Sequence, residues 1–95
     1  MDVIWSEGFK RSFKKLIKKN PQLKPKIFDV LRQLAEDPFT SSLKSHKLSG
    51  NLEELWSCSV NYDCRIIFTF SEDGESLEII ILLIDIGRHD QVYSK

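Results

Sequence analysis

The stretch from Leu77 to Ile84 is the most apolar part of the chain, with Glu78 as its only charged residue. A strand with one face in water alternates apolar and polar residues, whereas this stretch has no sustained alternation. It is therefore expected to be an interior strand of a sheet, covered on both faces. Its unbroken apolar part, Ile79 to Ile84, is too short to cross a bilayer, because a membrane-spanning helix needs about 20 apolar residues.

Two amphipathic helices are expected before that strand. The first follows Ser6, whose side chain can cap it, and begins near Gly8. It ends at Asn20-Pro21, because proline disfavours a helical conformation at the residue before it. The second is expected from Gln22 to Glu36, with Pro25 in its first turn. The apolar stripes are Phe9, Phe13, Leu16 and Ile17 in the first helix and Leu23, Ile27, Val30, Leu31 and Leu34 in the second.

Three further strands are expected around the interior strand. Asp2 to Trp5 predicts a short first strand. A hairpin is expected from Leu55 to Val60 and from Arg65 to Phe70, with its turn at the polar residues Asn61-Tyr62-Asp63. An Asp-Gly turn within residues 71–75 then leads into the apolar strand. The segment from residue 40 to residue 51 has the composition of a loop, and residues 85–95 form a polar tail.

The resulting order is β-α-α-β-β-β, which predicts the α+β class. Two helices would pack on one face of a four-stranded, mainly antiparallel sheet and leave the other face available for function. A chain of 95 residues is expected to form a single domain over residues 1–95.

The charges of the chain are divided unevenly. Through Gly50 there are eleven Lys or Arg and five Asp or Glu, a net charge of +6, and the remainder carries −6. Such asymmetry indicates a polyanionic partner, although a solvated amphipathic helix would carry the same charge.

Several chemistries are excluded by what the sequence lacks. Cys58 and Cys64 have neither the spacing nor the neighbouring histidines of a zinc site and are expected to be reduced, structural thiols. There is no nucleotide-binding glycine loop and no metalloprotease or hydrolase motif, so no metal or cofactor is expected. The N-terminus does not resemble a signal peptide, which favours a cytoplasmic location without a membrane partner.

The residues that remain are suited to RNA cleavage. Without a metal, this reaction needs a base for the ribose 2′-OH, positive charge for the phosphorane and an acid for the leaving 5′-oxygen. His46 and His89, the only histidines, both lie where loops are expected. Asp63 and Arg65 are two residues apart and would project to one side of a strand. The same four residues could equally be ordinary surface side chains, and Tyr93 could stack on a base or cover the edge of the core.

Three stretches resemble one known family. Ser45-His46-Lys47-Leu48-Ser49-Gly50, the hairpin from Leu55 to Phe68, and the ending from Ile86 to Tyr93 are similar to the RelE/ParE superfamily of toxins from toxin–antitoxin pairs. The similarity is greatest to the YafQ and RelE/StbE-type messenger-RNA endonucleases. It spans nearly the whole chain, including the lysine-rich first helix.

This resemblance implies a type II toxin that cleaves messenger RNA in the A site of the 70S ribosome and is held inactive by a cognate antitoxin in a hetero-oligomer. It implies His46 or Asp63 as the base, His89 as the acid, and Arg65 with Lys47 as the groups that stabilise the phosphorane. The expected products are a 2′,3′-cyclic phosphate and a 5′-hydroxyl. The residues expected to bind substrate are Lys44, Lys47, Arg88 and Tyr93.

Two positions depart from the family pattern. Ser59 stands where YafQ-like members have a histidine, and Cys64 replaces a bulkier residue. The identity of the base therefore stays open. Two other readings also stay open: a ParE-like toxin that inhibits DNA gyrase without cleaving RNA, and a non-catalytic relic that only binds an antitoxin.

Overall fold

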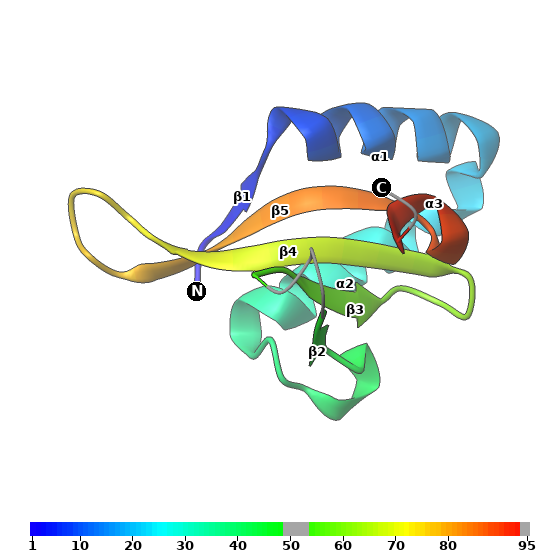
Figure 1. Ribbon diagram of the computed structural model, residues 1–95. Coiled ribbons are helices and arrows are strands. Elements are labelled where there is room, and N and C mark those ends of the chain that lie inside the picture. The colour runs from blue at the N-terminus through cyan, green and yellow to red at the C-terminus, as the bar shows by residue number, and fades with distance from the viewer. Residues whose placement is uncertain (49–53, 94–95) are drawn as a thin grey trace.

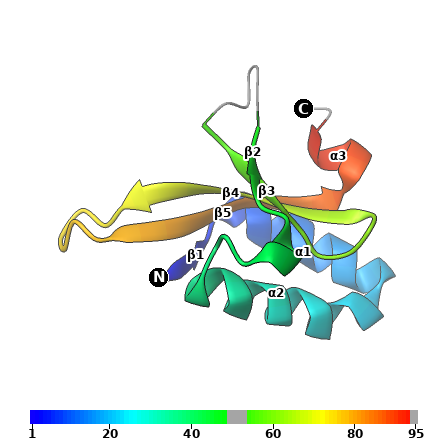
Figure 2. The ribbon, with the colours of Figure 1, turned by 90° about the horizontal axis from the view of Figure 1, so that it is seen from below.

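The computed structural model describes residues 1–48 and 54–93, with residues 91 and 93 described by their backbone alone. Five strands form one mixed sheet in the order β1-β5-β4-β3-β2. Helices α1 and α2 lie on one side of the sheet, and α3 lies on the other (Figure 2). The strands are β1 (Val3–Trp5), β2 (His46–Lys47), β3 (Trp56–Ser59), β4 (Cys64–Glu72) and β5 (Ile79–Arg88). The helices are α1 (Glu7–Lys19), α2 (Lys24–Glu36) and α3 (His89–Tyr93), with 3-10 turns η1 (Pro21–Leu23) and η2 (Ser41–Leu43).

The α+β class and the mainly antiparallel pairing are confirmed, since only β1 pairs in parallel, with β5. The expected number of four strands is wrong. The fifth strand is β2, which pairs antiparallel with β3 inside the segment expected to be a loop. A strand of two residues has no periodicity of its own, so its pairing depends on β3, which lies further along the chain.

Strand β5 is an interior strand, as expected, because β1 and β4 flank it (Figure 1). Ile81 and Leu83 are fully buried. Coverage of both faces fails at the start of the apolar stretch, where Leu77 is 70% exposed and Ile79 is 45% exposed. Leu77 lies between β4 and β5 and Ile79 begins β5. The hairpin of these two strands projects away from the helices (Figure 1). The buried part of the strand extends instead to Gly87.

The two long helices form for the reasons expected from the sequence. Ser6 caps α1, because its Oγ accepts a hydrogen bond of 3.1 Å from the Phe9 amide. Pro25 lies in the first turn of α2, which begins at Lys24 because the preceding residues form a 3-10 turn. The main core contains Phe9 and Phe13 from α1, Ile27, Val30, Leu31 and Leu34 from α2, and Cys58, Ile66, Phe68, Ile81 and Leu83 from the sheet.

Helix α1 runs close along β5. A Cβ atom at Gly8 would lie only 3.3 Å from the Ile84 carbonyl oxygen, so the glycine allows this approach. The Ser6 amide donates a hydrogen bond of 3.2 Å to the Leu83 carbonyl, where β1 has ended. Beyond β1, one edge of β5 is therefore without a partner strand and lies beside α1, while β4 continues to pair with the other edge.

The second face of the sheet is covered at one end by α3, in a segment expected to be a polar tail. This helix contacts β4 and β5. Val92 is 4% exposed and Ile67 of β4 is 3% exposed, and neither belongs to the main core cluster. Five residues are too few to show helical periodicity, so this helix could not be predicted from the sequence.

Candidate active site

The turn between β3 and β4 is held by the side chain of Asn61. Its Oδ1 accepts hydrogen bonds from the amides of Asp63 at 2.9 Å and Cys64 at 2.8 Å. The Ser59 hydroxyl donates to the Asn61 carbonyl at 3.0 Å. Asparagine is common in such turns because its side chain can bond to the backbone two residues on. The turn fixes Asp63 and leaves the neighbouring Tyr62 side chain 94% exposed.

Asp63 is joined to the end of β5 and the start of α3. The Arg88 Nε lies 3.4 Å from Asp63 Oδ2 and 3.9 Å from Asp90 Oδ1. The His89 amide donates a hydrogen bond of 2.9 Å to the Asp63 carbonyl oxygen. Three of the expected site residues, Asp63, Arg88 and His89, therefore lie together, and we refer to them as the corner.

The side chains of Arg65 and Asp63 contact different partners. Strand β4 begins at Cys64, so the argument from alternation along a strand does not reach Asp63. The Asp63 carboxylate pairs with Arg88, whereas the Arg65 guanidinium donates to the Asn61 and Cys64 carbonyl oxygens. The expectation that these two side chains project together from one strand is wrong.

His46 lies on the same face of the sheet as Arg65. It pairs with Ser57, which pairs with Ile67, two residues along β4 from Arg65. Directly opposed residues share a face, as do residues two apart in a strand. Strand spacing of about 4.8 Å and a rise of about 3.3 Å per residue put the two Cα atoms roughly 12 Å apart.

The imidazole of His46 is exposed, and its Nδ1 lies 3.2 Å from the Lys44 carbonyl oxygen. A carbonyl can only accept, so Nδ1 carries the proton in the neutral ring and Nε2 is left as an acceptor. Lys44 itself is exposed and adopts a left-handed backbone conformation with φ of 51°.

Lys47 points to the other face of the sheet. It pairs with Trp56, which pairs with the buried core residue Phe68. The structure therefore separates Lys47 from His46 and Arg65, and the expectation that Lys47 acts beside Arg65 is not supported. The Tyr93 side chain lies outside what the structure describes.

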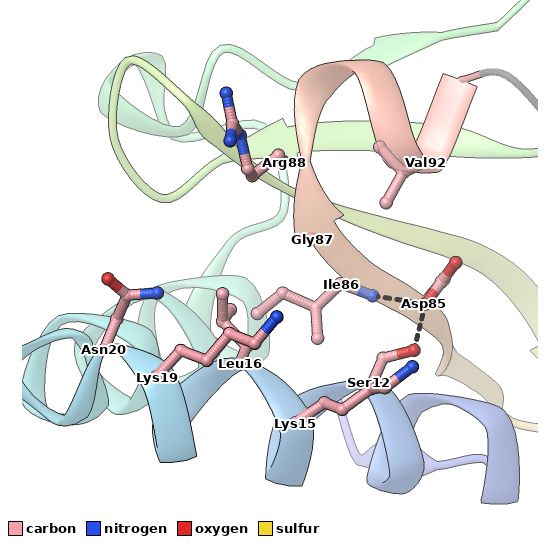
Figure 3. Close-up of a pocket in the computed structure, with 10 residues that line it drawn as sticks. All are labelled: Ser12, Lys15, Leu16, Lys19, Asn20, Asp85, Ile86, Gly87, Arg88 and Val92. Carbon is pink, nitrogen blue, oxygen red and sulfur yellow. Dashed lines mark hydrogen bonds between the residues drawn. The ribbon is translucent and has the colours of Figure 1, made fainter.

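A pocket of about 410 Å³ opens beside the corner, between α1, the end of β5 and α3 (Figure 3). Asp85 is 7% exposed at its wall, and its Oδ1 accepts hydrogen bonds from Ser12 Oγ at 2.6 Å and the Ile86 amide at 2.9 Å. From the sequence, the lysines of this pocket belong to a basic helix that fits a polyanionic partner, whereas no pattern indicated a role for Asp85. The lining residues are Ser12, Lys15, Leu16, Lys19, Asn20, Asp85, Ile86, Gly87, Arg88 and Val92.

The thiols are structural. Burial raises the pKa of Cys58 to about 12 and that of Cys64 to about 11, so both stay protonated at neutral pH. Within residues 1–48 and 54–93, no group of three or more His, Cys, Asp or Glu residues could hold a metal ion. In the same part of the chain, no helix is both long enough and apolar enough to span a membrane.

Comparison with known proteins identifies the family. Residues 1–94 match the family model described as the bacterial toxin of type II toxin–antitoxin system, YafQ. The Toxin YoeB of Synechocystis is 30% identical over 71 residues, which cover 75% of this chain and 71% of that protein.

Solved structures share the fold. The crystal structure of YafQ from E. coli strain BL21(DE3) has a TM-score of 0.77 at 17% identity and covers 97% of each chain. The YoeB/ParE toxin from Agrobacterium tumefaciens has a TM-score of 0.75 at 21% identity, covering 94% of this chain and 99% of that one. In the E. coli DinJ-YafQ toxin–antitoxin complex, the matching chain has a TM-score of 0.75 at 18% identity, with 97% and 96% coverage. The present chain therefore belongs to the YafQ family of toxins from bacterial type II toxin–antitoxin systems.

Proposed function

We propose that this toxin is a ribosome-dependent endoribonuclease that cuts messenger RNA in the A site without a metal ion. The observation that supports this most is the corner, where an arginine, a carboxylate and the residue His89 meet although Asp63 lies far from Arg88 and His89 in the sequence. These groups supply what the reaction needs: a base, a cation for the phosphate and an acid.

In the proposed mechanism, Asp63 or His46 accepts the proton of the 2′-OH, which attacks the adjacent phosphorus. The negative charge that develops on the phosphorane is stabilised by Arg65 and Arg88. Arg88 takes the place first expected for Lys47, because it contacts Asp63 directly, whereas Lys47 does not share the face of His46 and Arg65. His89 then protonates the departing 5′-oxygen, which leaves a 2′,3′-cyclic phosphate and a 5′-hydroxyl.

The His46 tautomer is compatible with a role as base. Its Nδ1 faces the Lys44 carbonyl, so Nε2 is the nitrogen that can accept a proton. Asp63 competes for this role, but its carboxylate is already paired with Arg88. Ser59, which lies opposite Arg65, cannot replace the histidine of YafQ-like members as a base near neutral pH.

The decisive variant is His89→Ala. Loss of a general acid typically lowers the rate by about 10²- to 10⁴-fold, so cutting of messenger RNA on translating ribosomes should fall by at least 10²-fold. Binding to the antitoxin should persist. Full cutting by the folded variant would refute the role of His89.

A matched pair of variants tests Asp63. Asp63→Asn and Asp90→Asn each remove one of the two carboxylates near Arg88, and both residues are exposed. Cutting should fall strongly in the first variant and remain close to that of the unmodified protein in the second. Equal losses would show that the Arg88 ion pairs matter only for charge balance.

The partners follow from the same proposal. DinJ-YafQ complexes have been solved for the E. coli relative, and we propose that a cognate antitoxin likewise binds this chain as a hetero-oligomer in the cytoplasm. The whole chain, residues 1–95, would act as one toxin domain. A ParE-like activity would instead appear as inhibition in a gyrase supercoiling assay with no cut messenger, and an antitoxin-binding relic would give neither signal.

A further inference from the structure

We propose that the pocket between α1, β5 and α3 binds a backbone phosphate of the RNA strand next to the one that is cleaved, with Lys15 and Lys19 as its anchors. This inference rests on the proposed function and extends it to a binding site on α1. From the sequence alone, Lys15 and Lys19 are only two of the lysines on a basic helical surface.

The charges in the pocket favour an anion. Lys15 and Lys19 are one helical turn apart on α1 and extend along the same wall of the pocket, and Arg88 lies at its far end (Figure 3). Neither lysine forms an ion pair within the part of the chain that the structure describes. Like charges four residues apart in a helix repel each other, and a bound anion would relieve that repulsion.

Asp85, the one acidic residue of the lining, already accepts hydrogen bonds from within the protein. The Asp85 Oδ1 accepts hydrogen bonds from Ser12 and from the Ile86 amide, and the side chain is buried at the wall. Since Arg88 is already paired with Asp63 and Asp90, Lys15 and Lys19 against the Asp85 carboxylate leave the lining with a formal charge of +1. Asn20 adds a side-chain amide that can donate to a phosphate oxygen.

The position of the pocket favours RNA over an acidic protein segment. Arg88 lines this pocket and also a smaller hollow of about 260 Å³ that contains Asp63. A strand with its reacting phosphate at the corner would therefore bring a neighbouring phosphate to Lys15 and Lys19. The apolar side chains of Leu16 and Val92 would face the ribose or base between the two phosphates.

The experiment uses two double variants of the full chain that remove equal charge from the same helix. Lys15→Ala with Lys19→Ala alters the pocket. Lys14→Ala with Lys18→Ala is the matched control, because those lysines have the same spacing on α1 but do not line either pocket. The probe is a short single-stranded RNA with 2′-O-methyl groups, which cannot be cleaved, and its affinity is measured by fluorescence anisotropy at several salt concentrations.

The pocket variant should bind this RNA at least 10-fold more weakly than the control. The slope of log affinity against log salt should fall by about 0.7, since one phosphate contact on a single strand contributes roughly that amount. Equal affinities and slopes for the two variants would overturn the proposal. So would a pocket variant that loses affinity for a polyglutamate peptide but keeps its affinity for RNA, because the pocket would then serve acidic protein side chains.

Cutting by the unmodified toxin on translating ribosomes is measured alongside. If it cuts and the two variants bind RNA equally, the pocket proposal fails and the nuclease proposal stands. If it does not cut but only the pocket variant loses RNA affinity, the nuclease proposal fails and the phosphate site stands.

Discussion

Replacing Ser12 by alanine tests how α1 is fixed to β5. The Ser12 hydroxyl donates a hydrogen bond of 2.6 Å to the carboxylate of Asp85, which is only 7% exposed. A hydrogen bond to a charged group contributes about 1.5–3 kcal/mol. Alanine returns about 0.5 kcal/mol through its higher helix propensity. The free energy of unfolding should therefore fall by about 1–2.5 kcal/mol, as measured by urea denaturation.

Ser42→Ala is the matched control for that measurement. Ser42 also donates a hydrogen bond to a side chain, Gln33 Oε1 at 2.8 Å, but the bond is exposed and the acceptor is neutral. Its loss should change the free energy of unfolding by less than about 0.5 kcal/mol, as for most surface substitutions. Equal effects of the two substitutions would refute the reasoning, because they would show that burial of Asp85 adds nothing to the Ser12 hydrogen bond.

Four further outcomes are expected. At pH 8, Cys58 and Cys64 in the folded protein should react with iodoacetamide at least about 100-fold more slowly than free cysteine, because their pKa values of about 12 and about 11 leave little thiolate. The same shifts should lower stability as the pH rises above about 8.5, since the unfolded thiols then ionise and the folded ones do not; a flat profile up to pH 10 would contradict this. Tyr62→Ala should weaken binding of the uncleavable RNA by roughly 5- to 150-fold, because stacking of a base on the exposed Tyr62 ring is worth about 1–3 kcal/mol. Phe39→Ala also removes an exposed ring and should not weaken this binding. Leu77→Gly should raise the free energy of unfolding by up to about 1 kcal/mol, seen as a higher urea midpoint, because Leu77 is exposed with φ of 62°. A lower midpoint would show that the Leu77 side chain is needed.

The parts of the fold that depend on local pattern could be predicted from the sequence. Ser6 caps α1, and the spacing of Phe9 and Phe13 identified its buried side. The interior position of β5 followed from its composition. Strand β2 and helix α3 could not be predicted, because each is too short to show a periodic pattern of its own.

The candidate site, too, could be predicted only in part from the sequence. Residue type alone indicated His46, Asp63, Arg65 and His89, but not which of them would meet. The pairing of Asp63 with Arg88 depends on the meeting of the β3–β4 turn with the end of β5. Neighbouring residues of a strand always face opposite sides, but the register between β2 and β3 decides which of His46 and Lys47 shares the face of Arg65, since a shift by one residue would exchange them.

Cleavage of messenger RNA on the ribosome by the corner and the face beside it can be tested by adding the purified toxin to ribosomes stalled with a defined codon in the A site and mapping both ends of the cut strand. We expect a cut inside that codon, with a 2′,3′-cyclic phosphate on one fragment and a 5′-hydroxyl on the other. An intact messenger, together with inhibition of gyrase supercoiling by the same preparation, would contradict it.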